Sequence, residues 1–208
     1  LPTTNRPASS RPPLAGDGPN GRLAYVQTLL GAIEMLKHGV TAVHDDPYHS
    51  PVPTTDGVDA IMQAYADSGM RATVSINYPN VVEYEKYPFL RDLLPADVVD
   101  RMAAQPQWRA DEIGDLYRWF HGKWHDACDG RLRIAVSNSA PQRVTDDYFA
   151  ALSEFSRAHD LPFDIHMLET RLQRVLGREK FGRSLIQHVR ELGFLDERML
   201  VIHAIWVD

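Results

Sequence analysis

The sequence predicts an α/β protein in which parallel strands alternate with helices, and two observations indicate this class. Short apolar segments rich in β-branched residues begin near positions 41, 72, 132, 163 and 199 of the 208-residue chain. They lack polar alternation, which is typical of strands buried on both faces of a parallel sheet. Segments with apolar residues at helical spacing lie between them, and glycine follows several of these segments. This order favours a parallel sheet covered by helices, either open or closed into a barrel.

The chain divides into an arm and a single α/β segment. Residues 1–20 contain five prolines and are expected to form an extended arm, because each proline fixes φ and removes an N–H donor. Residues 21–208 are expected to form the α/β segment. Its expected strands cover residues 41–43, 72–76, 132–136, 161–165 and 199–202.

The expected helices are recognised by apolar spacing together with residues that start or stop a helix. Thr54 can cap a helix, and Gly39, Gly69 and Gly193 can end one, since glycine adopts the left-handed conformation readily. The interval between the second and third strands is about twice as long as the others, so we expect an insertion within about residues 77–131. The expected helices cover residues 21–37, 55–68, 97–102, 111–124, 146–155 and 182–192.

Composition excludes several functional classes. The formal charge is −6, which disfavours a nucleic-acid partner because such binding depends on cationic contacts to phosphates. The sequence has no apolar run of about 20 residues, so we expect no membrane partner. The single cysteine, Cys128, permits no internal disulfide, and the first residues lack the pattern of a signal peptide. We therefore expect a cytoplasmic protein that acts on a small molecule.

Polar residues follow several of the expected strands, where the loops of a parallel α/β fold converge on a functional site. The sharpest local pattern is His166-Met167-Leu168-Glu169-Thr170, which follows the fourth expected strand. A neutral imidazole can ligate a divalent metal, and a carboxylate three residues later can move the proton of a metal-activated water. His203 ends the next strand and could orient that water or stabilise charge on a substrate. The competing interpretation is a pair of strand-end histidines hydrogen-bonded to neighbouring loops.

The segment 166–170 resembles the H-x-x-E-T motif of the amidohydrolase superfamily, in the branch of cytosine deaminase, the triazine chlorohydrolases and the adenosylhomocysteine-type deaminases. Three other segments, 35–43, 139–146 and 192–206, resemble that branch in the same order along the chain. The resemblance covers residues 23–208 and is weak over 81–130.

The resemblance implies a partial (β/α)8 barrel, with the five expected strands as about the second to sixth of eight. It implies a metal-dependent hydrolase that cleaves C–N bonds, with zinc as the expected metal and iron as the alternative. His166 would be a metal ligand, Glu169 would shuttle protons and His203 would assist attack on the substrate. The residues expected to line the substrate pocket are Gln142, His44 and Trp206.

The chain also departs from the family pattern. It contains no H-x-H, which supplies two metal ligands in the family, and it stops at Asp208, before an eighth strand. Because Leu1 is also not an initiator residue, we expect an interior fragment of a longer barrel, inactive by itself. The alternatives are a non-catalytic half-barrel that binds or scaffolds, and an unrelated open α/β binding domain. Unpaired sheet edges invite self-association, so we expect a homo-oligomer.

Other patterns are less specific. His121 and His125 lie four residues apart on an expected helix, where a solvated helix face is favoured over a metal pair. His44, Asp45 and Asp46 together with His49 could form a second metal site, but a pocket loop is favoured over it and a capped turn is favoured further. Cys128 lies among acidic residues, which would raise its pKa, so it is not expected to be a nucleophile.

Overall fold

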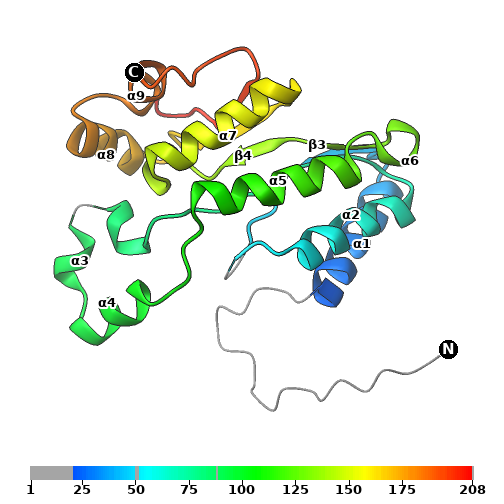
Figure 1. Ribbon diagram of the computed structural model, residues 1–208, viewed down its shortest axis with the longest axis horizontal. Helices are drawn as coiled ribbons and strands as arrows, with labels where there is room; N and C mark the ends of the chain where they lie inside the picture. Colours follow the sequence, from blue (N-terminus) through cyan, green and yellow to red (C-terminus); the bar gives the residue numbers. More distant parts are fainter. Residues whose placement is uncertain (1–20, 50–51, 88, 208) are drawn as a thin grey trace.

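The computed structural model describes residues 21–49, 52–87 and 89–207, and the expected arm over 1–20 lies outside the described residues (Figure 1). All strand pairings are parallel, and the strands form two three-stranded sheets in the orders β1-β2-β3 and β4-β5-β6. The strands are β1 (Ala42–Asp45), β2 (Arg71–Val74), β3 (Leu132–Ile134), β4 (Val136–Asn138), β5 (Phe163–Met167) and β6 (Met199–His203).

Strands β3 and β4 form one extended segment that changes its partner at Ala135. The Ala135 N–H donates to the Val74 carbonyl at 2.9 Å, and the Val136 N–H donates to the Pro162 carbonyl at 2.8 Å. The segment therefore joins the two sheets. Five parallel segments follow one another in chain order, at the places where the sequence predicts strands. The strand expected over 132–136 differs only in this break and in its extension to Asn138.

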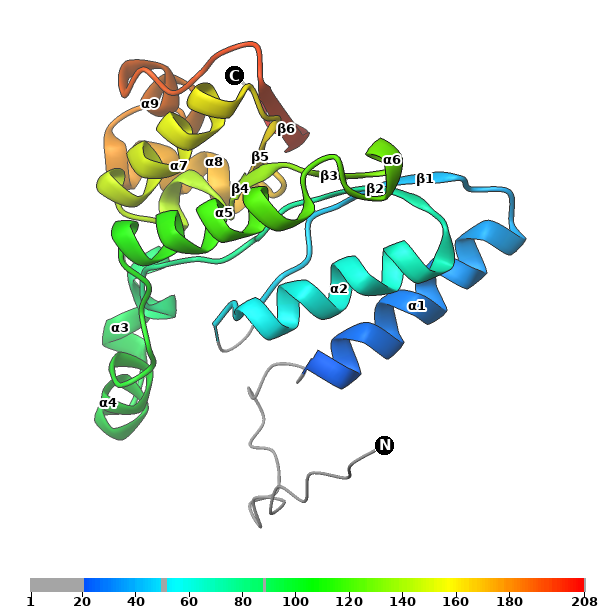
Figure 2. The same cartoon turned by 45° about the vertical axis from the view of Figure 1, so that its right-hand side comes forward.

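The helices cover the strands, except for a hairpin-like extension (Figure 1, Figure 2). Both views show α3 and α4 standing apart from the body, between β2 and α5 in the chain. The helices are α1 (Gly21–Lys37), α2 (Thr55–Ser68), α3 (Leu90–Leu93), α4 (Ala96–Ala103), α5 (Ala110–Trp124), α6 (Ala127–Gly130), α7 (Asp146–His159), α8 (Arg171–Phe181) and α9 (Leu185–Glu191), with short 3-10 turns at Glu83–Lys86 (η1) and Pro141–Arg143 (η2).

The helix ends follow local chemistry. Thr54 caps α2 as expected, since its hydroxyl accepts from the Gly57 N–H at 3.1 Å. The expectation of a helix over 182–192 is wrong at its start. Gly182 has φ of 68° and ends α8, and α9 begins only after Ser184, whose hydroxyl caps it. Helix α8 itself is absent from the sequence-based expectations.

Tyr117 of α5 fills the place where the two sheets diverge. Its side chain is fully buried. Its hydroxyl accepts from the N–H groups of Ile76 at 3.1 Å and Ser137 at 2.9 Å, and donates to the Ile76 carbonyl at 3.3 Å. The backbone ladder is open between β2 and β4, and the phenol satisfies groups that a neighbouring strand would otherwise bond.

The two outer strands and α1 correct one expectation. The sequence predicts strands buried on both faces, yet the residues of β1 and β6 are exposed or only partly buried, because neither strand has a second neighbouring strand among the described residues. Helix α1 packs against α2 through small residues such as Ala24 and Ala32. Four of its larger apolar residues are exposed: Leu23, Val26, Leu30 and Ile33.

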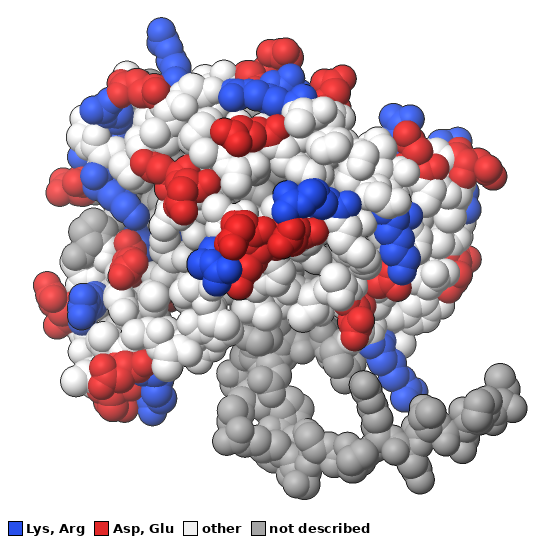
Figure 3. All heavy atoms as spheres, viewed as in Figure 1, with Lys and Arg blue, Asp and Glu red and all other residues white. Residues whose placement is uncertain are grey.

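The described surface carries charges of both signs. Figure 3 shows Lys and Arg interspersed with Asp and Glu over the face that displays α5 and α7. Within the described ranges, no helix combines the length and apolar character that a membrane span requires.

Candidate active site

The ends of β5 and β6 are locked together, and this positions two of the expected site residues. In register, His166 pairs with Ile202 and Met167 with His203. Beyond the strands, the Leu168 carbonyl accepts from the N–H groups of Ile205 at 3.2 Å and Trp206 at 3.1 Å. Residues Leu168, His203 and Ala204 have positive φ values of 57°, 79° and 51°. Such conformations cost free energy in non-glycine residues and often mark functional sites.

Glu169 stands between β5 and α8. Thr170 caps α8, with its hydroxyl accepting from the Gln173 N–H at 3.4 Å. The Gln173 side chain in turn accepts from the Glu169 N–H at 3.0 Å. This reciprocal pair fixes the backbone of Glu169 and leaves its carboxylate free to face the strand ends.

The structure brings His166, Glu169 and His203 together. The rings of His166 and His203 have centroids 5.4 Å apart. The His203 Nε2 lies 3.8 Å from the Glu169 Oε1. All three side chains are partly exposed, so a small molecule can reach them. An imidazole pair beside a carboxylate can bind a metal and can transfer protons.

Two residues that the sequence reasoning left without a role surround His166. The Asp46 Oδ2 lies 3.4 Å from the His166 Nδ1, and the Asn77 Nδ2 lies 3.5 Å from the same atom. Asn77 donates to Asp46 at 2.7 Å, and the Ser75 hydroxyl bonds the other oxygen of Asp46. The signal for Asp46 and Asn77 was present, since each follows a predicted strand.

His44 binds a carboxylate in the interior. Its Nε2 lies 2.6 Å from the Oδ2 of Asp164, which is fully buried on β5. The hydrogen bond to Asp164 raises the pKa of His44, and burial raises the pKa of Asp164. The sequence signal for Asp164 was an acidic residue inside an apolar strand.

Gln142 and Trp206, the other expected pocket residues, differ in their surroundings. Gln142 is buried in η2, and its Oε1 has no hydrogen-bond partner among the described residues. Trp206 is partly exposed in the turn after β6, where its backbone N–H donates to the Leu168 carbonyl. Other buried polar atoms without a partner in the described part of the chain include those of Asn77, Ser137, Asn138, Ser139 and Asp164, in or near β2, β4 and β5. Such atoms are available to a ligand.

His166 fits the role of one metal ligand. Its Nδ1 faces Asp46 and Asn77, whereas its Nε2 has no hydrogen bond or ion pair within the described residues. A metal-binding imidazole is characteristically held in this way through its other nitrogen. Over the described ranges, no group of three or more His, Cys, Asp or Glu side chains is arranged to hold a metal. The described residues therefore supply part of a ligand set.

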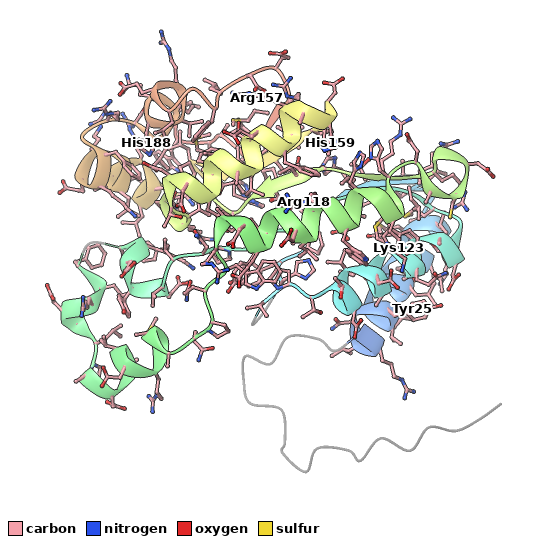
Figure 4. All side chains as sticks on the ribbon, viewed as in Figure 1. Tyr25, Arg118, Lys123, Arg157, His159 and His188 are labelled. Atoms are coloured by element: carbon pink, nitrogen blue, oxygen red, sulfur yellow. The ribbon has the colours of Figure 1, made fainter. Side chains whose placement is uncertain are left out.

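The remaining histidines have other surroundings. His121 stacks on His125 with ring centroids 4.9 Å apart, and the ring centroid of His159 lies 4.3 Å from that of His121. Figure 4 labels His159 on α7. The Nδ1 of His125 accepts from the Ile134 N–H at 3.4 Å. His121 of α5 and His159 of α7 place this cluster at the contact between the two helices. His49 is buried, and burial lowers its pKa to about 4.

Polar side chains at the carboxyl ends of parallel strands stand where α/β barrels and open α/β sheets place their functional sites. In a comparison with known families, the profile of the amidohydrolase family matches residues 18–208. The chain belongs to the amidohydrolase family, which confirms the resemblance seen in its motifs.

Curated relatives and solved structures agree with this assignment. A 5-methylthioadenosine/S-adenosylhomocysteine deaminase from Archaeoglobus fulgidus is 28% identical over 88% of the chain and 37% of its own length. A 5'-deoxyadenosine deaminase from Methanosarcina barkeri is 22% identical over 88% of the chain and 35% of its own length.

Among solved structures, atrazine chlorohydrolase from Arthrobacter aurescens, in complex with zinc, has a TM-score of 0.74 at 19% identity. That match covers 89% of this chain and 38% of the chlorohydrolase. An adenosine deaminase from Xanthomonas campestris with bound zinc has a TM-score of 0.66 at 21% identity, over 89% of this chain and 35% of the deaminase. The chain thus spans little more than a third of these proteins.

Proposed function

We propose that this chain is the central part of a metal-dependent hydrolase that cleaves C–N bonds of small cyclic molecules. The observation that carries the proposal is the grouping of His166, Glu169 and His203 at the ends of adjacent strands. Relatives named as deaminases of adenosine derivatives support deamination of a nitrogen heterocycle as the reaction class.

We propose that the five parallel segments are the second to sixth strands of a (β/α)8 barrel, with the other strands supplied by further chain. The exposed edge strands β1 and β6 support this, because each can accept another strand. We also propose a homo-oligomer, because a strand edge that is left unpaired can pair with a second copy of the chain.

The proposed cofactor is a divalent metal, zinc by preference and iron as the alternative, held by the His166 Nε2 and by ligands from the other strands. When bound, the metal supplies a Lewis acid that lowers the pKa of a water toward neutrality. Two observations fit His166 to a metal: its Nε2 has no hydrogen bond or ion pair among the described residues, and its Nδ1 faces Asp46 and Asn77.

The chain's own residues would perform the proton transfers. Glu169 would take a proton from the attacking water and deliver it to the leaving nitrogen, which requires a carboxylate that can reach both. His203, 3.8 Å from Glu169, would stabilise charge that develops on the substrate. We propose Gln142, His44 and Trp206 as pocket residues, of which Gln142 has a buried Oε1 without a partner in the described residues.

Two substitutions in the full-length gene product test this assignment. Glu169→Gln should lower the hydrolytic rate roughly 10²–10⁴-fold, the usual contribution of an acid–base group, and leave metal content nearly unchanged. His166→Ala should lower metal content, because it removes a ligand, and activity should fall with it. Steady-state kinetics and elemental analysis of the same preparations provide both readouts.

The two variants control each other, because they lie three residues apart and a general folding defect would affect both alike. If Glu169→Gln loses metal as readily as His166→Ala, the glutamate is a ligand or a structural group and the proposed mechanism is wrong.

The alternative function is a non-catalytic half-barrel that binds or scaffolds. It is favoured by one observation, namely that the described residues contain no group of three potential metal ligands. Elemental analysis of the unmodified full-length gene product separates the two: about one tightly held metal per chain supports the enzyme, and none supports the alternative.

A further inference from the structure

We propose that Asp46 is a positioning residue that fixes the tautomer and ring orientation of His166. The inference rests on the proposed function only where His166 is taken as a metal ligand. Its structural part, the hold of Asp46 on the imidazole, can be tested without metal or substrate.

The Asp46 carboxylate is held in place on both oxygens. Ser75 bonds Oδ1, and Asn77 donates to Oδ2 at 2.7 Å. Ser75 is fully buried, Asn77 is 5% exposed and the Asp46 side chain is 8% exposed. Backbone bonds continue past the strand ends, since the Ser75 N–H donates to the Asp45 carbonyl at 3.0 Å. The carboxylate therefore has little freedom to move away from the imidazole.

A second side-chain contact joins the same two chain segments two residues before the Asp46–His166 contact. His44 and Asp164 are bonded at 2.6 Å, and each lies two residues before one member of the Asp46–His166 contact. Residues i and i+2 of a strand face the same side, so the two contacts stack along the interior. Strands β1 and β5 are not neighbours, because β2 and the β3–β4 segment lie between them. The spacing between Asp46 and His166 is thus set by two successive contacts across the interior.

The chemistry of this contact selects one tautomer. An anionic carboxylate 3.4 Å from Nδ1 favours the imidazole that carries its proton on Nδ1. The Asn77 amide has two N–H groups: it donates to Asp46 at 2.7 Å, and donation to the His166 Nδ1 would favour the other tautomer. That second contact is 3.5 Å long, at the limit of a hydrogen bond and therefore weak, so the carboxylate is the stronger influence on Nδ1. The Nε2 lone pair of His166 is then available toward the exposed side of the ring, as a metal ligand requires.

The test is ¹⁵N NMR of the histidine rings in the metal-free full-length gene product. Wild-type His166 should carry its proton on Nδ1. Asp46→Asn should shift the population toward the Nε2–H form and should weaken zinc binding about 10–100-fold, the usual effect of losing such a partner. Asp46→Glu, which retains the carboxylate, should recover part of both effects.

Asp45→Asn is the matched control. It removes a carboxylate from the adjacent residue, but Asp45 accepts from the Tyr65 hydroxyl at 2.8 Å and does not face His166. It should leave the His166 tautomer unchanged.

The proposal is overturned if wild-type His166 carries its proton on Nε2, an outcome that needs no variant. It is also overturned if Asp46→Asn leaves the tautomer unchanged or if Asp45→Asn shifts it equally. A tautomer shift in Asp46→Asn without zinc binding to the wild type would support the positioning role and refute the proposed function. Zinc binding to the wild type without a tautomer shift in Asp46→Asn would refute the positioning role and support the proposed function.

Discussion

Replacing Tyr117 by Phe tests how the two sheets are joined. The substitution removes one oxygen and leaves the buried ring in place. In the native protein that hydroxyl makes three bonds to the backbone of Ile76 and Ser137. Burial raises the pKa of Tyr117 well above its ordinary value, so the neutral phenol that donates to the Ile76 carbonyl persists across the working pH range.

The magnitude follows from the groups left without partners. Two buried N–H groups lose their acceptor, and each unsatisfied donor costs about 1–3 kcal/mol. Allowing for partial relaxation of the backbone, the free energy of unfolding should fall by about 3 kcal/mol. Ile76 and Ser137 directly precede Asn77 and Asn138. Because the substitution removes the acceptor of the Ile76 and Ser137 N–H groups, these two amides should also exchange faster with solvent.

Tyr148→Phe is the matched control. Tyr148 is 1% exposed, and no hydrogen bond of its hydroxyl is found among the described residues. Its replacement should cost less than about 1 kcal/mol. Urea denaturation of the full-length gene product, followed by circular dichroism, gives both values if the m-value is unchanged. Equal losses of unfolding free energy in the two variants, or unchanged amide exchange at Ile76 and Ser137, would refute the view that the Tyr117 hydroxyl joins the two sheets.

Two further predictions concern stability. His49 is buried, and burial lowers its pKa to about 4. Below about pH 6.5 the unfolded state binds a proton on His49 that the folded state does not bind, so the free energy of unfolding falls as the pH falls. The loss should be about 2 kcal/mol between pH 7 and pH 5, and His49→Gln should flatten that part of the profile in urea titrations; an unchanged slope would contradict the assignment. Gly177→Ala should destabilise by about 1–3 kcal/mol, because its Cβ would lie 3.0 Å from the Arg183 carbonyl oxygen and 3.1 Å from the Leu185 nitrogen. Gly122→Ala, where a Cβ meets nothing within 4 Å, should stabilise by about 0.5–1 kcal/mol, and thermal unfolding that ranks the two the other way would show that the contact is not restrictive.

Local patterns were sufficient for the strands and most helices. The five strand positions, the span of α1 and the Thr54 cap of α2 follow from periodicity and capping chemistry, which act over a few residues. Helix α8 was missed because its sequence is mostly polar, although Thr170 and Gly182 offered a cap and a stop. The motif at 166–170 and three further segments in the same order indicated the family, because the residues of each segment are contiguous in the chain.

The contacts that shape the candidate site were decided only by the tertiary structure. His44 meets Asp164 across 120 residues of chain, and Asp46 meets His166 across a similar separation. The change of partner at Ala135 and the exposure of β1 likewise depend on which strands become neighbours. No local pattern encodes such pairings, because the free energy of an interior ion pair depends on burial and distance, which exist only once the sheet has curved to bring β1 toward β5.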